Sequence, residues 1–524
     1  MKNQVESILI VGGGSSGWMT GAALTKHLPN IKISLVESPD IKTIGVGEST
    51  LGHINEFFHF LGLKDEDWMK HCNATYKTSI KFTDFRDNPT EKPYTFHYPF
   101  GRWDIENRPN GLMDWFYYKA KYPQHPCDNF AEYFHDAVLM TDANKMTYNE
   151  NGALRNFNPF IDVAYHMNAA LFGNYLRDFV CLPNGLNHIL ATVKGASKDE
   201  SGCISKIHTD KGDLTADLYI DCTGFKSLLL EEIMGVPFDS FSDMLMNDRA
   251  IAAPISYIDK DREMECVTNC TAIENGWVWN TPLWDRIGTG YVYSSQFVSD
   301  DEALNQFKKH LKSNRMICRD DKRIDKAEFR QIKIRHGKHE RSWEKNVIAV
   351  GLSNGFVEPL ESTGLLMTHE SIIKLTNTLK TRNGYYNKLD VESFNFSLNK
   401  QIDTFKQFIG MHYGLSRRND TEYWRHVTNS VSYKSPLFES FSLFTHNDRA
   451  YFSNFSDGSF YIAAGMGYNP ADNSKFDFIC KLRNSDPYLP EKLMDDWEKH
   501  KREVMRIIHR LPTHYEFLKK HIYK

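Results

Sequence analysis

Three glycines near the N-terminus have the spacing of a dinucleotide-binding turn. Gly12, Gly14 and Gly17 form the pattern G-x-G-x-x-G directly after the apolar run 8–11. In such a turn the first glycine permits a tight bend, the second lets the backbone approach a pyrophosphate, and the third lets the next helix pack on the strand. The N–H groups and the positive end of that helix then attract the phosphates. The pattern therefore predicts a nucleotide site.

An acidic residue completes this motif. Glu37 ends a second apolar run, 33–36, and follows Gly17 by twenty residues. A carboxylate at this distance accepts hydrogen bonds from the ribose hydroxyls of an adenine dinucleotide. A glycine-rich turn without a ligand is the alternative. The complete order of strand, turn, helix, strand and acid favours nucleotide binding.

Other side chains are suited to chemistry but lack a decisive spacing. Lys77 lies in the segment 74–82, which has the pattern of one strand. A lysine on a strand usually extends its amine to solvent, so this residue alone does not predict catalysis. Trp277 and Trp279 share one face of another predicted strand, where they form either a bulky wall or ordinary core.

The elements that position these residues indicate an α/β fold. The runs 8–11 and 33–36 predict parallel strands, because strands buried on both faces are apolar throughout. Two further strands of this kind are predicted at 218–225, where the strand ends in a glycine turn, and at 346–351. Loops at the carboxyl ends of parallel strands face the ligand, so we expect the loop 352–365 beside the nucleotide.

The rest of the chain is inserted into this fold or follows it. The segment 83–160 predicts irregular chain, 164–180 predicts a helix, and 250–300 alternates as antiparallel strands do. After residue 386 the pattern is mainly helical. We therefore predict a dinucleotide-binding domain with an inserted antiparallel sheet over residues 1–385, and a mainly helical C-terminal region over residues 386–524.

Composition limits the class of protein. The net charge of −4 over 524 residues, with acidic and basic residues mixed, argues against a nucleic-acid surface. Nine cysteines without a C-x-x-C pair argue against a zinc site or a disulfide framework and favour a reducing compartment. No apolar run reaches membrane-spanning length, and the start of the chain leaves no room for a signal peptide. We expect a cytoplasmic protein without a metal, nucleic-acid or membrane partner, and leave its oligomeric state open.

Three features favour FAD over NAD as the dinucleotide. The first is a second apolar strand that ends in the turn from Asp221 to Gly224. The second is that the last parallel strand of the same sheet, 346–351, comes far later in the chain, and the third is that only one glycine fingerprint is present. A flavoprotein that also uses NADPH usually carries a second fingerprint. The electrons are therefore expected from a separate enzyme.

Together, five segments resemble the flavin-dependent tryptophan halogenases over nearly the whole chain. They are the glycine turn 12–19, the loop 45–50, the segment 74–82, the motif Trp277-x-Trp279-x-x-Pro282 and the loop 356–364. Thr281 departs from this motif, since the family usually has Ile there. The resemblance implies an FAD-binding, Rossmann-like fold of the GR2, monooxygenase-like type. It also implies that the protein uses a halide, O2, and FADH2 supplied by a separate flavin reductase.

The resemblance assigns roles to individual residues. Lys77 corresponds to the catalytic lysine and Glu361 to the active-site glutamate, while Thr363 and Gly364 correspond to the halide-binding residues. The residues expected at the flavin are Gly12, Gly13, Gly14, Ser16, Gly17, Glu37, Ser38, Ile41, Val46, Ser49, Ile189, Asp221, Leu352 and Leu365. The residues expected along the passage from the flavin to the lysine are Trp277, Trp279, Pro282 and Ser362.

The resemblance also implies a mechanism. FADH2 and O2 oxidise a halide held at Thr363 and Gly364 to hypohalous acid, while the paired tryptophans keep the aromatic substrate from the flavin. Lys77 either hydrogen-bonds the hypohalous acid or becomes a haloamine, and burial would lower its pKa. Glu361 stabilises the cationic ring or accepts its proton.

The expected substrate pocket departs from that of the tryptophan-specific members. Tyr98 stands where those members have the His of a His-Pro-Phe-Gly segment, although Phe100 is kept. Ser453 and Asn454 stand where those members place a Phe-Trp pair against the indole. These departures disfavour free tryptophan as the substrate and favour an indole, a phenol or another electron-rich aromatic. The protein would then be a member of the family with a different substrate, and a phage-encoded member is one such origin. The main alternative function is an FAD-dependent aromatic hydroxylase, which would not need Lys77.

Overall fold

The computed structural model describes residues 3–41, 47–90, 92–101, 115, 118–119, 121–148, 154, 157–159, 161–313, 321–431, 458–468 and 489–524. The chain forms two compact units, each drawn from three segments. The first unit comprises Met1–Ala74, His166–Leu245 and Ile334–Lys406, and the second comprises Thr75–Tyr165, Met246–Lys333 and Gln407–Lys524. This grouping follows contacts in space, so it differs from the division at residue 385 that chain order suggests.

The first unit is built on a six-stranded sheet in the order β21-β22-β13-β2-β3-β9. Its parallel strands are β2 (Ser7–Val11), β3 (Lys32–Glu37), β9 (Asn187–Leu190), β13 (Leu218–Asp221) and β22 (Val347–Ala349). The antiparallel edge strand is β21 (Trp343–Glu344). The four strands predicted as the centre of the α/β fold are therefore confirmed.

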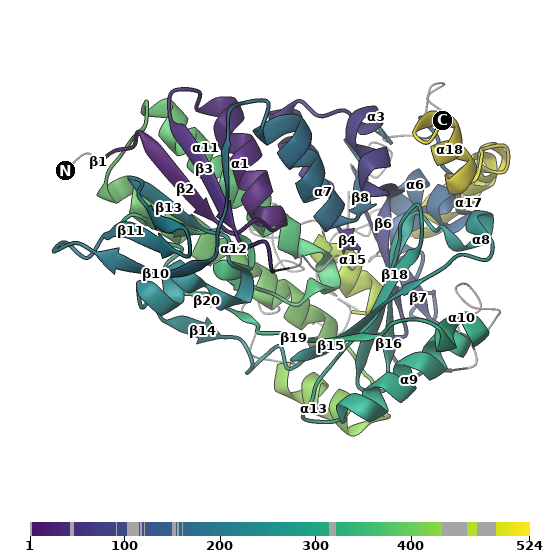
Figure 1. The fold of residues 1–524 in the computed structure, drawn as a ribbon. Coiled ribbons are helices and arrows are strands. Elements are labelled where there is room, and N and C mark those ends of the chain that lie inside the picture. Colours follow the sequence, from purple (N-terminus) through teal and green to yellow (C-terminus); the bar gives the residue numbers. More distant parts are fainter. Residues whose placement is uncertain are drawn as a thin grey trace. The chain divides into compact units, whose positions relative to one another are not determined.

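Both faces of this sheet are covered, as its apolar strands require. On one face α1 (Ser15–His27) packs between the sheet, α7 (Ala169–Leu176) and α11 (Thr363–Thr381) (Figure 1). On the other face an apolar core joins β2 and β13 to β11 (Ile204–Thr209) and to the π-helical turn Leu228–Ile233. The smaller sheet on that side also contains β10 (Val193–Lys198) and β12 (Gly212–Leu214).

The helix predicted over 164–180 begins later than expected. Residues Ala164–Met167 form strand β8, and α7 starts only at Ala169. Asn168 sets this boundary, because its side chain accepts hydrogen bonds from the N–H groups of Ala170 and Leu171. The remaining helices of the first unit include α2 (Ile54–Leu61) and α3 (Asp65–Trp68).

The second unit is built on a seven-stranded sheet in the order β19-β15-β18-β17-β16-β6-β7. The strands are β6 (Ser79–Thr83), β7 (Thr95–Pro99), β15 (Arg249–Ile255), β16 (Val267–Ile273), β17 (Gly276–Pro282), β18 (Ile287–Tyr293) and β19 (Arg330–Lys333). The antiparallel strands predicted over 250–300 are confirmed. Helix α9 (Asp300–Ser313) lies against this sheet (Figure 1). Its Phe307 and Leu311 are buried in a core with residues of the sheet.

The single strand predicted over 74–82 is wrong, because the chain forms two strands that break at Thr78. The first is β5 (Thr75–Lys77) and the second is β6. At the break, the Thr78 N–H donates to the Cys266 carbonyl over 2.8 Å, and the Thr78 carbonyl accepts from the Phe100 N–H over 3.0 Å. These partners lie far along the chain, so the local pattern gave no sign of the break.

The segment 83–160 is more regular than predicted. Besides β7 it contains the short helices α5 (Phe130–Phe134) and α6 (Asp136–Asp142). The described residues after 386 are mainly helical, as predicted. Their helices are α12 (Lys388–Gly414), α13 (Glu422–Val431), α15 (Gly458–Gly465), α17 (Leu489–Ile508) and α18 (His514–His521).

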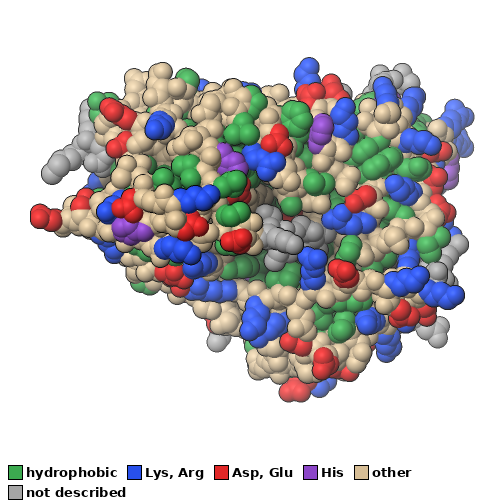
Figure 2. Space-filling view, in the orientation of Figure 1, with side chains coloured by type: hydrophobic (Ala, Val, Ile, Leu, Met, Phe, Trp, Pro, Cys, Tyr) green, Lys and Arg blue, Asp and Glu red, His purple; other side chains and the backbone are tan. Residues whose placement is uncertain are grey.

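The surface carries both signs of charge. On the face shown in Figure 2, Lys and Arg side chains alternate with Asp and Glu side chains. Among the described helices, none combines the length and the apolar character needed to cross a bilayer.

Candidate functional site

The glycine turn in the first unit is as tight as its spacing predicts. Gly12 has a φ of +113°, and a Cβ there would lie 2.3 Å from the carbonyl oxygen of Cys222. A Cβ on Gly17 would lie 1.9 Å from the carbonyl oxygen of Gly12. Both positions therefore exclude any side chain. Gly12 permits the sharp bend of the turn, and Gly17 permits the close approach of α1 to β2.

The other two glycines of the turn leave room for a ligand and place the acid beside it. Gly14 is the N-cap of α1, and a Cβ there would meet nothing within 4 Å. A Cβ on Gly13 would lie 1.6 Å from Oε2 of Glu37, whose Oε1 lies 2.8 Å from Nε2 of His188. An open helix N-terminus next to a carboxylate fits the pyrophosphate and ribose of a dinucleotide such as FAD.

Asp221 has a structural task that the sequence did not indicate. Its buried carboxylate accepts hydrogen bonds from the N–H and hydroxyl of Thr223, and from the N–H groups of Leu229 and Leu230. Burial raises its pKa, although these four hydrogen bonds oppose that shift. The Asp221 side chain therefore fixes the turn after β13 and caps the π-helical turn. A contact between this side chain and the flavin stays a prediction.

The remaining residues predicted at the flavin lie on several elements of the first unit. Leu352 lies in the short 3₁₀ turn Gly351–Ser353, which follows β22. Its apolar side chain is 40 % exposed, so a flat ligand could cover it. Ile41 is 78 % exposed beyond the end of β3. Ser38 shares a hydrogen bond of 2.9 Å with the hydroxyl of Thr192. The other positions are Ser16 on α1, Ile189 on β9 and Leu365 on α11, while Val46 lies outside the described residues.

The loop after β22 leads into a second candidate anion site. A short 3₁₀ turn, Pro359–Glu361, buries Glu361, and Ser362 then adopts a left-handed φ of +57°. The hydroxyl groups of Ser362 and Ser49 are hydrogen-bonded over 3.0 Å. Helix α11 begins at Thr363, so its first N–H groups and its positive end lie at this loop.

Thr363 and Gly364 have the properties that a halide site needs. The Thr363 side chain is 1 % exposed, and its hydroxyl has no hydrogen-bond partner among the described residues. A Cβ on Gly364 would meet nothing within 4 Å. A buried hydroxyl donor, adjoining free space and a helix N-terminus together fit a small anion such as chloride or bromide.

In the second unit, Lys77 is buried and does not reach solvent as an ordinary strand lysine would. Its side chain is 0 % exposed, and Nζ lies 5.0 Å from the centre of the Phe100 ring. Thr78 is the residue after Lys77, and its carbonyl accepts a hydrogen bond from the Phe100 N–H. This bond holds the backbone of Phe100 next to that of Lys77. The structure therefore brings together the predicted catalytic lysine and a predicted substrate residue.

The sequence did not indicate which residues hold the lysine strand. The ring of His514 is buried, with Nδ1 3.1 Å from the Met264 carbonyl oxygen and Nε2 3.2 Å from the Tyr76 nitrogen. Nδ1 therefore donates and Nε2 accepts, which requires a neutral ring. Burial lowers the pKa of His514 to about 4, in agreement with that state. The hydroxyl of Thr75 also donates to the Pro282 carbonyl over 2.5 Å, so β5 is tied to the end of the tryptophan motif.

The paired tryptophans share one face of β17, as predicted. Trp277 is buried and Trp279 is half-buried, with ring centres 6.1 Å apart and planes inclined by 57°. Gly290 on the neighbouring strand makes room for Trp279, because a Cβ there would lie 2.1 Å from the indole ring. Tyr98 stacks on Tyr461 with a ring separation of 5.6 Å.

The candidate residues fall into two groups. The residues predicted for the flavin and the halide lie in the first unit, except Val46, which is not described. Lys77, Phe100, Tyr98 and the paired tryptophans lie in the second unit. Asn454 lies outside the described residues. Within the described part of the chain, no cluster of three or more His, Cys, Asp or Glu side chains could hold a metal ion.

Comparisons with known proteins show which sequences and structures this chain is similar to. A family model described as tryptophan halogenase matches residues 7–479. Tryptophan 6-halogenase ThaL of Streptomyces albogriseolus is 31 % identical, over 99 % of this chain and 99 % of ThaL. The apo structure of VirX1 is similar with a TM-score of 0.90 and 43 % identity, over 99 % of both chains. The structure of Tar14, a tryptophan C-6 flavin-dependent halogenase from taromycin biosynthesis, has a TM-score of 0.81 and 31 % identity, over 98 % of this chain and 99 % of Tar14.

Proposed function

Because the chain belongs to the tryptophan halogenase family, we propose that it halogenates an electron-rich aromatic ring and that Lys77 delivers the halogen. The protein is a flavin-dependent halogenase that uses FADH2, O2 and a halide. An FAD-dependent aromatic hydroxylase, the alternative that the sequence left open, is not favoured by these relatives. A cytoplasmic location stays a prediction.

The cofactor supplies the redox chemistry. When bound, FADH2 gives two electrons to O2, the halide gives two more, and with one added proton the products are FAD, hypohalous acid and water. In the proposed site the Thr363 hydroxyl and the first N–H groups of α11 hold the halide, since they are hydrogen-bond donors beside open space. Gly14 and Glu37 would hold the pyrophosphate and the ribose.

Lys77 acts on the hypohalous acid. Its amine either hydrogen-bonds the acid or loses a proton and forms an N–halogen bond with release of water. In both cases the ring carbon attacks the halogen, and Glu361 accepts the ring proton or stabilises the cationic ring. The observation that carries this proposal is the burial of Lys77 beside a predicted substrate residue: its side chain is 0 % exposed, and its amine lies 5.0 Å from the centre of the Phe100 ring.

The proposed substrate is an indole- or phenol-type aromatic and not free tryptophan. The printed names of ThaL and Tar14 assign tryptophan to those enzymes. In this chain Tyr98 replaces the histidine of the tryptophan-specific pattern and stacks on Tyr461. The ring wall at Phe100 is kept, so an aromatic substrate is still accommodated. A separate flavin reductase is the proposed electron donor.

A product assay tests this function. Purified protein receives a flavin reductase, NADH, FAD, bromide and a panel of indoles and phenols, with tryptophan included, and products are identified by mass spectrometry. We expect bromination of a non-tryptophan aromatic by the wild type and by Lys70→Ala, which removes an exposed lysine. Lys77→Ala should lower product formation by roughly 100-fold or more. Hydroxylated products, or bromination that survives Lys77→Ala, would contradict the proposal.

A further inference from the structure

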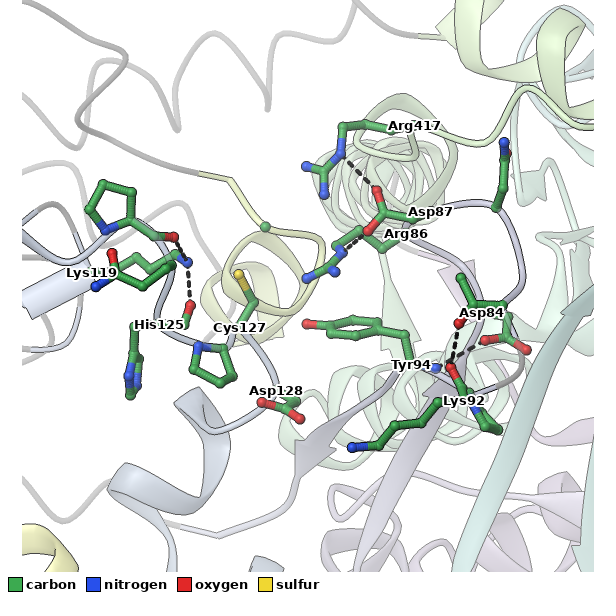
Figure 3. A pocket seen from close by; sticks show the side chains of 17 residues that line it. Asp84, Arg86, Asp87, Lys92, Tyr94, Lys119, His125, Cys127, Asp128 and Arg417 are labelled. Atoms are coloured by element: carbon green, nitrogen blue, oxygen red, sulfur yellow. Dashed lines mark hydrogen bonds and ion pairs between the residues drawn. The ribbon is translucent and has the colours of Figure 1, made fainter.

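The second unit contains a cavity that the halogenation site does not use. Its volume is about 690 Å³, which is in the range of sites for small organic molecules. It lies at the turn that joins β6 to β7 (Figure 3). The side chains that matter for its chemistry are Asp84, Arg86, Asp87, Tyr94, Lys119 and Arg417.

The cavity is remote from Lys77. Phe100, the ring beside the lysine, follows β7, whereas Tyr94 at the cavity precedes β7, and six residues of extended chain span roughly 20 Å. Helix α15 follows β7 between these points, since a Cβ on Gly458 would meet Tyr98 and a Cβ on Gly465 would meet Phe96. All residues of α15 are buried, and neither Lys77 nor Phe100 lines the cavity.

Two arginines face the cavity with their outer N–H groups available. Nε of Arg417 donates to Asp87 Oδ1 over 2.9 Å, and Nε of Arg86 donates to Asp87 Oδ2 (Figure 3). The Arg86 guanidinium also lies 3.6 Å from the centre of the Tyr94 ring, which holds its plane in place. Among the described residues, the Nη groups of Arg86 have no acceptor, and those of Arg417 have only the Met466 carbonyl at 3.4 Å. Asp87 therefore orients both guanidinium groups without using their outer donors.

The charge of the lining favours an anion. The lining contains four cationic side chains and three carboxylates, so cationic groups are in excess. The cationic residues are Arg86, Lys92, Lys119 and Arg417, and the acidic residues are Asp84, Asp87 and Asp128. Burial acts to raise the pKa of Asp87, but hydrogen bonds from Arg417 and Arg86 outweigh it and leave the pKa below its ordinary value.

Lys119 adds a partly satisfied cation to this lining. Its buried amine donates to the carbonyl oxygens of Pro123 and His125. An ammonium group has three N–H donors, and among the described residues only these two carbonyl oxygens accept from it, so one donor is left for a ligand.

We propose that this cavity is a second binding site, for a small organic molecule that carries a carboxylate or a phosphate group. The guanidinium groups of Arg86 and Arg417 bind the oxyanion, because their planar forks match its geometry. The ring of Tyr94 and the prolines at 93, 123 and 126 contact the organic part. The proposal goes beyond the halogenation function, since it concerns neither the flavin, the halide nor Lys77.

Calorimetric titration tests the site. The probes are benzoate, phenyl phosphate and inorganic phosphate, with the neutral benzamide as the ligand control, all at 0.15 M salt, a level close to physiological. We expect benzoate or phenyl phosphate to bind the wild type, and the stronger of the two identifies the carboxylate or the phosphate as the preferred group. Arg86→Gln and Arg417→Gln should each weaken that binding at least about tenfold, which is the loss of one charge-assisted contact. The matched control Arg425→Gln, which changes an exposed arginine of α13, should leave it unchanged.

The outcomes separate this proposal from the proposed function. Binding of none of the anions, equal binding of benzamide, or equal losses in Arg425→Gln would overturn it. If Arg86→Gln fails to fold, as a thermal melt would show, Arg417→Gln decides the matter, because its side chain is 53 % exposed and does not support the core. Bromination by Arg86→Gln and by Arg417→Gln should equal that of the wild type. A failure of the proposed anion site is therefore distinguishable from a failure of the proposed halogenase function.

Discussion

Two buried polar side chains, Lys77 and Thr363, carry the proposed chemistry. Burial of an amine or a hydroxyl costs free energy unless polar partners compensate for lost water. The Thr363 hydroxyl has no such partner among the described residues. The Lys77 amine lies 5.0 Å from the centre of the Phe100 ring, which is a predicted wall of the substrate pocket. The Thr363 hydroxyl is therefore best explained by something that it binds during the reaction.

Gly14 offers a test at the residue scale. Nothing lies within 4 Å of a Cβ built on this glycine, and its φ of −75° is open to alanine. Gly14→Ala should therefore change the free energy of unfolding by about 1 kcal/mol or less, as measured by urea unfolding of the apoprotein. The added methyl group occupies the space proposed for the pyrophosphate. The dissociation constant of FAD, measured by fluorescence titration, should rise roughly tenfold.

Gly195 provides the matched control for this substitution. It lies on β10 in the same unit, and its Cβ would also meet nothing within 4 Å. Gly195→Ala should leave the affinity for FAD unchanged. Equal affinity in Gly14→Ala and Gly195→Ala would show that the pyrophosphate does not lie at Gly14.

At the scale of elements, the short strand β5 depends on a helix from the far end of the chain. Strands of three residues are weakly held by their own ladder, and here His514 of α18 supplies an acceptor for Tyr76 and a donor for Met264. We therefore regard His514 as a positioning residue for Lys77. It does not touch the proposed reacting atoms.

Replacement of His514 should impair the lysine strand selectively. His514→Leu leaves the Tyr76 N–H and the Met264 carbonyl without this partner, which should cost about 1 to 3 kcal/mol in the free energy of unfolding. We expect kcat for bromination to fall while the dissociation constant of FAD, whose predicted residues lie in the other unit, stays unchanged. His509→Leu, which changes an exposed histidine after α17, should alter neither quantity. Equal kcat values for wild type and His514→Leu would contradict this role.

The same residue predicts a pH dependence of stability. Burial lowers the pKa of folded His514 to about 4, whereas an unfolded histidine titrates near 6.5. Between these values the unfolded chain binds a proton that the folded chain does not, so the contribution of His514 is complete above pH 6.5 and is lost as the pH falls toward 4. The difference in unfolding free energy between wild type and His514→Leu should therefore shrink from pH 7.5 to pH 4.5. A difference that is constant over this range would exclude a neutral His514.

The sequence predicts those elements whose cause is local. The apolar runs at β2 and β3, together with the glycine turn, specify the centre of the first sheet, because burial on both faces leaves a clear pattern. The break at Thr78 could not be predicted, since its hydrogen-bond partners, Cys266 and Phe100, come from other segments. The structural task of Asp221 was hidden for the same reason.

At the scale of the whole molecule, two units are each assembled from three separate segments. Chain order suggested a boundary at residue 385, because a sequence shows neighbours along the chain and not those in space. Only part of the candidate site could be predicted from the residues themselves. The glycine turn and Glu37 follow from motif chemistry, whereas the roles of Lys77, Glu361 and Thr363 came from resemblance to a family, since no spacing in the sequence relates them.

In the proposed mechanism, halide oxidation and ring halogenation depend on different residues, Thr363 for the first and Lys77 for the second. Lys77→Met keeps an unbranched side chain in the buried site and removes the amine. In one reaction with bromide, a scavenging dye reports free hypobromous acid and mass spectrometry reports the brominated aromatic. For Lys77→Met we predict oxidised bromide within twofold of the wild type, a rise in scavenged hypobromous acid and a fall in brominated product of roughly 100-fold. If bromide oxidation stops with Lys77→Met, or if the brominated product persists, the two residues do not divide the reaction in this way.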